Sequence, residues 1–114
     1  MNSAERALTV HPEPCCAPLA DGPLSELEST RFAAILAALA DPVRLRLLSI
    51  IAATGEVCSC DLEAPLHRSQ PTISHHTRVL AEAGLIVGTR RGKWTWWQIV
   101  PERLSEVCRI LGAA

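Results

Sequence analysis

Apolar side chains recur every three or four residues from position 23 to 39 and again from 42 to about 55. This spacing places them on one side of a helix, so the pattern predicts two consecutive helices. The apolar stripe of the first helix consists of Leu24, Leu27, Phe32, Ile35, Leu36 and Leu39. In the second helix Asp41 is placed to cap the N-terminus, Pro42 lies in the first turn and Gly55 ends the helix. Because the second helix is apolar on most sides, we expect it to lie at the centre of the fold.

After a short predicted helix at about 60–66, the next helical segment has few apolar residues and many polar ones. Ser69 is placed as its N-cap, Pro71 lies in its first turn, and Gly84 ends it. Short donors and cations fill the faces that its sparse apolar stripe leaves free, at Ser69, Gln70, Thr72, Ser74, His75, His76 and Arg78. Bulky side chains in the first turns would keep the backbone away from the base edges of DNA. We therefore predict that this helix reads the major groove.

Two strands are predicted next, at 85–91 and 94–100, and a short basic turn joins them. Arg90, Arg91 and Lys93 lie at this turn, where we expect them to contact the phosphates of DNA. A winged helix-turn-helix typically has a helix that ends at a glycine and is followed by a basic hairpin. The predicted fold class is therefore mainly α with a β-hairpin wing (α+β).

The second strand of the wing carries three tryptophans. Successive side chains of a strand alternate between its faces, so Trp94 and Trp96 share one face and Trp97 takes the other. We expect these side chains to pack in the core or at a dimer contact rather than to stack on bases.

Pro101 opens a last helix with one apolar side, formed by Leu104, Val107, Cys108, Ile110 and Leu111. The first and last helices carry more apolar surface than a small domain can cover, so we expect a homodimer. Twofold symmetry would also place two reading helices about one turn of DNA apart. Residues 1–22 are rich in proline and lack a sustained period, which predicts a flexible arm. Residues 23–114 are the predicted DNA-binding and dimerisation domain.

The composition, 114 residues with 48% hydrophobic and 20% charged side chains, predicts one folded domain. No apolar run approaches the roughly 18 residues of a membrane span, and no signal-peptide pattern opens the sequence. We expect a cytoplasmic protein with reduced thiols and no membrane partner. The net charge of −1 argues weakly against nucleic acid, but the charge is segregated. Residues 67–93 carry five basic side chains against Glu82 alone, so the predicted reading helix and wing are basic.

Five cysteines are candidate ligands or packing residues. Cys15 and Cys16 are adjacent, which disfavours a disulfide between them, since their Cα atoms are about 3.8 Å apart, but suits a soft ion. Cys58 and Cys60 flank a serine in a polar stretch before the short helix. We predict that these four are metal ligands and that Cys108 packs as a small apolar side chain.

From about Leu24 to Leu111 the sequence resembles the ArsR/SmtB family of metal-responsive repressors. The matching segments are 38–45 at the second helix, 56–62 before the short helix, 69–85 at the reading helix and 91–94 at the wing. The Cys-x-Cys-Asp-Leu element at 58–62 is similar to that of arsenite sensors. The segment 13–16 of the arm resembles another branch of arsenic repressors, in which an N-terminal cysteine pair joins a cysteine near the short helix of the partner subunit.

The resemblance implies a repressor, not an enzyme, that binds double-stranded operator DNA as a homodimer. It implies release from DNA when cysteine thiolates bind arsenite or antimonite, As(III) or Sb(III), which favour three sulfur ligands. The expected ligands are Cys15 and Cys16 with Cys58, Cys60 or both, from the same or the facing protomer. Of the latter pair we favour Cys58, which lies nearer the preceding helix and is not expected to turn inward.

Three departures from the family pattern bear on this interpretation. Arsenite sensors with the Cys-x-Cys element have a third cysteine where this chain has Glu63, so the pair alone is incomplete. The last helix offers Glu102 and Glu106 but no histidine, which disfavours the zinc site of related sensors. Thr77 stands where the family has leucine at a core-facing position, and we expect it to lower stability.

Two other effectors stay open at this point. All four thiolates in a tetrahedral site could hold cadmium, lead or zinc. Oxidation of the thiols could also release DNA without a metal. A thiol enzyme is not expected, because Glu56, Asp61 and Glu63 would raise the pKa of the nearby Cys58 and Cys60 thiols.

Overall fold

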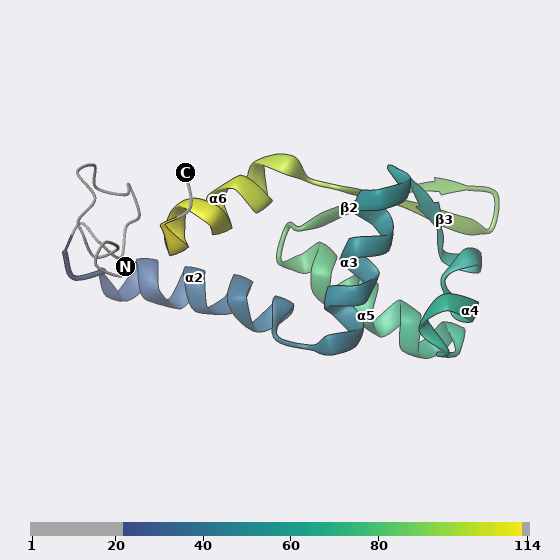
Figure 1. The fold of residues 1–114 in the computed structure, drawn as a ribbon, viewed down its shortest axis with the longest axis horizontal. Coiled ribbons are helices and arrows are strands. Elements are labelled where there is room, and N and C mark those ends of the chain that lie inside the picture. The colour runs from purple at the N-terminus through teal and green to yellow at the C-terminus, as the bar shows by residue number, and fades with distance from the viewer. Residues whose placement is uncertain (1–21, 113–114) are drawn as a thin grey trace, which may run out of the picture.

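The structure is a computed structural model that describes residues 22–112 as a set of helices around one small sheet (Figure 1). In chain order the elements are α2 (Glu26–Leu39), α3 (Pro42–Thr54), β1 (Val57–Cys58), a 3₁₀ turn (Ser59–Asp61), α4 (Glu63–Leu66), α5 (Gln70–Glu82), β2 (Ile86–Arg91), β3 (Trp94–Ile99) and α6 (Pro101–Leu111). The predicted fold class, mainly α with a β-hairpin wing, is confirmed. Residues 1–21, with Cys15 and Cys16, lie outside the described residues.

Helix α2 begins three residues later than the sequence pattern predicted. The Ser25 hydroxyl accepts a hydrogen bond from the Glu28 backbone N–H at 3.0 Å, and the Glu28 carboxylate accepts from the Ser25 N–H at 2.9 Å. This capping box satisfies two amides that have no partner inside the helix, and it sets the start. The predicted start at Pro23 is therefore wrong. Leu24 precedes the helix, and Leu27, which is 79% exposed, does not belong to a buried stripe within one chain.

Helix α3 has the boundaries and the central place that its sequence predicted. The Asp41 carboxylate accepts a hydrogen bond from the Arg44 backbone N–H at 3.0 Å, which holds the pKa of Asp41 below its usual range. Gly55 ends the helix with φ of 85°, a conformation that favours glycine. Leu47 and Ile51 are fully buried in a core that α5, α4 and the sheet also line. Burial of such side chains is the main source of stability in a domain of this size.

The sheet has the strand order β1–β3–β2 and is antiparallel throughout. The sequence predicted the β2–β3 hairpin but not β1, which is too short to show an alternating pattern. Cys58 of β1 pairs with Trp96 of β3. Gly88 of β2 allows the indole of Trp97 to lie close, because a Cβ atom at position 88 would be 2.8 Å from its ring. Residues 58–60, called the thiol segment below, are therefore joined to the wing sheet through Cys58.

Two parts of the chain are distinguished below. The reader unit is residues 41–99, from the cap of α3 to the end of β3, and the outer helix pair is α2 with α6. Figure 1 shows these two helices running side by side away from the reader unit. Phe32 and Ile35 of α2 are buried, as are Val107 and Ile110 of α6. No helix between residues 22 and 112 combines the length and apolarity needed to span a bilayer.

Candidate nucleic-acid interface and thiol pair

Helix α5 is the element that the sequence predicted as the DNA reader. Ile73, Thr77 and Leu80 are buried and fix one side of the helix to the core. The opposite side exposes Ser74 and Arg78, and Ser69, His75 and Pro71 are also exposed. The helix therefore has one anchored side and one polar side that faces solvent.

Ser69 occupies the N-cap position of α5, as predicted, but its hydroxyl caps no backbone amide. It lies instead 3.4 Å from the Thr72 hydroxyl. At the other end, Gly84 has φ of 78°, and the Leu85 N–H donates to the Leu80 carbonyl at 3.0 Å across it. This is the glycine-terminated helix end that the sequence predicted.

Two of the predicted DNA contacts on α5, Gln70 and His76, bond to other elements of the chain. The Gln70 side-chain amide donates to the Ser59 carbonyl at 2.8 Å. Nδ1 of His76 is 3.2 Å from the Arg44 guanidinium, which also donates to the Ala38 carbonyl at 2.6 Å. Burial lowers the pKa of His76, which favours the neutral form of its ring. Both side chains thus help to position α5, a role that the sequence analysis did not foresee.

The three basic residues of the wing differ in how free their charges are. The Arg91 guanidinium donates twice to the Glu56 carboxylate, at 3.1 and 2.7 Å, and lies 5.1 Å from the Trp96 ring centre. Arg90 donates through Nε to the Gly92 carbonyl at 2.9 Å and keeps its charge exposed. Lys93 is exposed beside Trp94. Arg90 and Lys93 therefore carry the freer charges of the wing, whereas Glu56 offsets the charge of Arg91.

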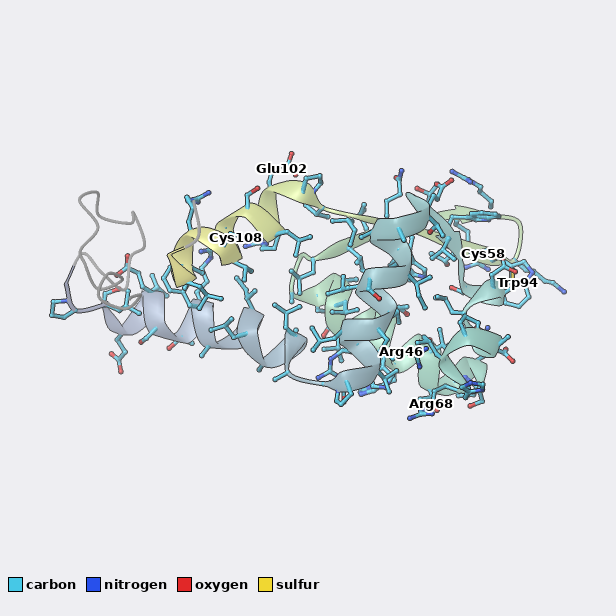
Figure 2. All side chains as sticks on the ribbon, viewed as in Figure 1. Arg46, Cys58, Arg68, Trp94, Glu102 and Cys108 are labelled. Carbon is cyan, nitrogen blue, oxygen red and sulfur yellow. The ribbon has the colours of Figure 1, made fainter. Side chains whose placement is uncertain are left out.

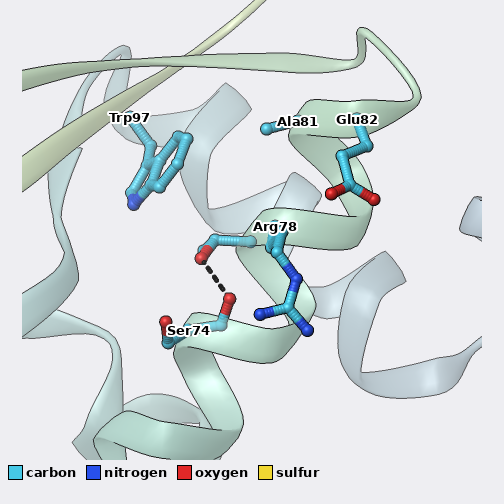
Figure 3. Close-up of a pocket in the computed structure, with 6 residues that line it drawn as sticks. Ser74, Arg78, Ala81, Glu82 and Trp97 are labelled. Carbon is cyan, nitrogen blue, oxygen red and sulfur yellow. Dashed lines mark hydrogen bonds between the residues drawn. The ribbon is translucent and has the colours of Figure 1, made fainter.

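A groove separates α5 from the wing, and Figure 3 shows the residues that line it. Trp97 of β3 forms one wall, and Ser74, Arg78, Ala81 and Glu82 of α5 project from the other. The polar side of α5 and the wing thus flank a common hollow. Such a surface is suited to a duplex that presents its groove to the helix and its backbone to the wing.

Cys58 and Cys60 lie next to this surface but differ in exposure. Cys58 is 1% exposed, whereas Cys60 is exposed in the 3₁₀ turn. The Cys60 backbone N–H donates to the Cys58 sulfur at 3.3 Å. The expectation that Cys58 does not turn inward is therefore wrong, because its strand pairing with β3 directs the side chain into the core. Cys60 is the thiol that an ion can reach first.

The pKa of the Cys60 thiol is raised, as the sequence predicted, but the chief cause is its contact with Cys58 rather than the neighbouring carboxylates. Its contact with Cys58, together with partial burial and the neighbouring Asp61, raises the pKa of Cys60 to about 11. The free thiol is therefore protonated at neutral pH and is a poor nucleophile, and a bound soft cation would have to displace its proton. Within residues 22–112, no three His, Cys, Asp or Glu side chains converge on a metal-sized site.

Cys108 does not pack as predicted. It is exposed on α6 in a single chain (Figure 2), because Val107 and Ile110 take the side of the helix that faces α2. On the same helix Glu106 forms ion pairs with Arg31 of α2 and with Arg103. Its pKa is lowered, chiefly by the hydrogen bond from Arg31. This carboxylate therefore holds the outer helix pair together.

A polar helix that is anchored on a core and flanked by a basic β-hairpin defines the class of winged-helix DNA-binding proteins. Residues 41–87 match the model of the bacterial regulatory protein, arsR family. An uncharacterized HTH-type transcriptional regulator of Methanocaldococcus jannaschii is 37% identical over 81 residues, which are 71% of this chain and 91% of that protein. The chain belongs to the ArsR family of transcriptional regulators, whose members are not enzymes.

Two further matches carry names that mention a metalloid. The arsenical resistance operon repressor of Escherichia coli K12 is 37% identical over 76 residues, 67% of this chain and 65% of that protein. The crystal structure of the AntR antimony-specific transcriptional repressor superposes with a TM-score of 0.67 at 27% identity, and covers 87% of this chain and 88% of that one. The chain is therefore similar in sequence and in fold to repressors that are named for arsenic and antimony.

Proposed function

We propose that this ArsR-family repressor binds operator DNA as a homodimer and releases it when trivalent arsenic or antimony binds its cysteine thiolates. The observation that carries the proposal is the Cys58–Cys60 pair, which is joined to the wing sheet through Cys58 and bonded to the start of the reading helix through Ser59. An ion held there acts on the two elements that face DNA. The names of the arsenical and antimony repressors that resemble this chain support the choice of ion.

DNA binding is proposed for α5 and the wing. The exposed groups on offer are Ser69, Ser74, His75 and Arg78 on the helix, with Arg90 and Lys93 on the wing. Thr72 is half-buried at the start of the helix, and Gln70, His76 and Arg91 contribute through the internal bonds described above. Short hydroxyls and an imidazole suit base edges, whereas the cations suit phosphates.

The dimer is proposed from the outer helix pair. Leu27 is 79% and Leu111 59% exposed in the single chain, which is unusual for leucines on two packed helices. A second copy packed on these helices would cover the two leucines.

The ligand set is proposed to contain at least three thiolates. As(III) prefers three sulfur atoms, and the described residues bring only Cys58 and Cys60 close together. We propose Cys15 and Cys16, which lie outside the described residues, as the source of the others. Cys60 is the better placed member of its pair for first contact, because it is exposed.

A gel-shift titration of one operator duplex with arsenite, antimonite, cadmium and zinc tests the effector. The duplex is selected from a random pool by the protein itself. Arsenite and antimonite are expected to free the operator at lower concentrations than either divalent ion. Release by cadmium or zinc alone would contradict the proposed effector and favour a tetrahedral thiolate site.

A further inference from the structure

Ser59, between the two cysteines, bonds to both elements that face DNA. Its carbonyl accepts the hydrogen bond from the side-chain amide of Gln70, the first residue of α5, at 2.8 Å. Its hydroxyl accepts from Nε1 of Trp97 at 2.9 Å and donates to the Thr95 carbonyl at 3.2 Å. Trp97 and Thr95 both lie on β3 of the wing. One residue therefore joins the thiol segment to the reading helix and to the wing.

The two residues that bond to Ser59, Trp97 and Gln70, are each held in place by other contacts. The Trp97 ring lies close to Gly88 and packs against the core, so its indole cannot follow a shift of the thiol segment without disturbing the wing. Gln70 is half-buried at the first turn of α5, where its bond to Ser59 sets the position of the helix start. Movement at Ser59 must therefore either break these bonds or move both DNA-facing elements.

An ion shared by Cys58 and Cys60 requires such movement. Cys58 is buried and its sulfur accepts the Cys60 backbone N–H, while Cys60 is exposed. The two thiols are already in contact, but the buried Cys58 sulfur must be uncovered before an ion can bind to it. Uncovering it turns the Cys58 side chain away from the core or rotates the backbone between the cysteines. Ser59 is the backbone between them.

We propose that Ser59 is the positioning residue that couples thiol occupancy to operator binding, through its bonds to Gln70 and Trp97. The inference rests on the proposed function in taking Cys58 and Cys60 as ligands. Ligand binding rotates the 58–60 segment and breaks the bonds of Ser59 to Gln70 and Trp97. The positions of α5 and the wing relative to each other are then no longer fixed through Ser59. Linkage requires the reverse effect as well, so operator binding holds the segment closed and keeps Cys58 buried.

Two measurements on the full-length protein test the coupling. The first is the ratio of operator Kd values with and without saturating arsenite. The second is the rate at which iodoacetamide alkylates Cys58, read by peptide mass spectrometry, with and without operator. Alkylation of a buried thiol needs local opening, so operator protection reports the coupling without any metalloid.

The variants are Ser59→Ala and Ser59→Thr, with Ser49→Ala as the matched control. The Ser49 hydroxyl bonds only within its own helix, to the Arg46 carbonyl at 2.7 Å. For wild type and Ser49→Ala, arsenite is expected to raise the operator Kd about 5- to 150-fold, the usual range of coupling between sites. Ser59→Ala removes the hydroxyl bonds to Trp97 and Thr95 but keeps the backbone carbonyl that accepts from Gln70. The ratio is therefore expected to fall at least about threefold below that of wild type while arsenite still binds, and operator protection of Cys58 to weaken. Ser59→Thr keeps a hydroxyl and is expected to restore both effects.

Trp97→Phe removes the same hydrogen bond from the other side and stands in if Ser59→Ala fails to fold. A full release ratio together with full protection of Cys58 in the variant overturns the inference. If arsenite does not release the operator from the wild-type protein, the proposed effector is refuted. The coupling is then decided by the protection of Cys58 alone. Absence of operator protection in wild type also overturns it.

Discussion

Side-chain hydrogen bonds join the elements of the reader unit, whereas the outer helix pair is joined by a few buried residues and leaves a leucine of each helix exposed. In the reader unit α3 lies at the centre of the core, and Ser59, Gln70 and Trp97 form bonds between elements. In the outer pair Leu27 and Leu111 face solvent, and the contact depends on a few buried residues and the ion pairs of Glu106. The proposed dimer through the outer helix pair would cover Leu27 and Leu111 and so account for this difference.

The largest expected effect follows from charging the outer helix pair. Leu27→Glu with Leu111→Glu places two carboxylates on the exposed leucines, which a second copy would have to bury. The protein is expected to become monomeric at micromolar concentration. Its operator affinity should fall at least about 100-fold, because two linked reading helices bind far more tightly than one. Sedimentation and fluorescence anisotropy measure the two effects.

Leu45→Glu is the matched control, since Leu45 is 53% exposed on α3 of the reader unit. It is expected to leave the dimer intact. A dimer that survives the change at Leu27 and Leu111 would show that the exposed leucines do not form the interface.

The wing should show that internal bonding decides which cations serve DNA. Each lost phosphate contact makes the dependence of log Kd on log salt shallower by about 0.9. Each substitution removes one contact from each protomer of the proposed dimer, so Arg90→Ala and Lys93→Ala are each expected to make the slope shallower by about 1.8. Arg91→Ala should change this slope less, because the Arg91 guanidinium is already bonded to the Glu56 carboxylate. In a Glu56→Gln background the cost of Arg91→Ala should rise to that of Arg90→Ala, and equal costs in the native background would contradict this ranking.

Acid should weaken the outer helix pair through Glu106. The folded-state pKa of Glu106 is lowered by Arg31, so its ion pairs stabilise the protein above the unfolded pKa of about 4.3. This stabilisation is lost as the pH falls through the lowered folded-state value. The difference in unfolding free energy between wild type and Glu106→Gln is therefore expected to shrink from pH 6 to pH 3, as urea titrations can measure. A constant difference over this range would exclude the assigned role.

The smallest effect concerns Thr77, which is buried on α5. Its hydroxyl donates to the Ile73 carbonyl at 3.0 Å, although that oxygen already accepts a helix bond. Thr77→Val removes a buried polar group and should raise the free energy of unfolding by up to about 1 kcal/mol. Thr54→Val is the control, because the Thr54 hydroxyl makes the same type of bond, to the Ile50 carbonyl at 2.8 Å, at an exposed site. Thermal denaturation should find little change in the control.

The sequence was sufficient for the elements that local signals define. Asp41 with Pro42 located α3, and Gly84 located the end of α5, since a cap and a positive φ are properties of a few adjacent residues. The start of α2 was misjudged because Pro23 resembled a first-turn residue, whereas the capping box of Ser25 with Glu28 was overlooked. That box was readable in the sequence.

The arrangement of the site depended on contacts that no local pattern reports. Burial of Cys58 and exposure of Cys60 follow from a two-residue strand that pairs with β3, about 40 positions later. The pairing of Arg91 with Glu56, and of Gln70 with Ser59, likewise joins segments distant in the chain. Exposure of Cys108 was missed because several helix faces were apolar enough to pack. The sequence could thus predict which side chains are candidates for the site. It could not predict which of these side chains form bonds inside the folded chain.

The proposed function requires that arsenite releases the operator by binding to Cys58 and Cys60 of the reader unit. The direct test is the anisotropy of a labelled operator, fully bound at the start, as arsenite is added. Wild type and Cys108→Ser are expected to release the DNA completely at similar arsenite concentrations. Cys58→Ala with Cys60→Ser, which keeps a small apolar group at the buried position, is expected to hold the operator throughout. Release of this double variant at the wild-type arsenite concentration would contradict the account.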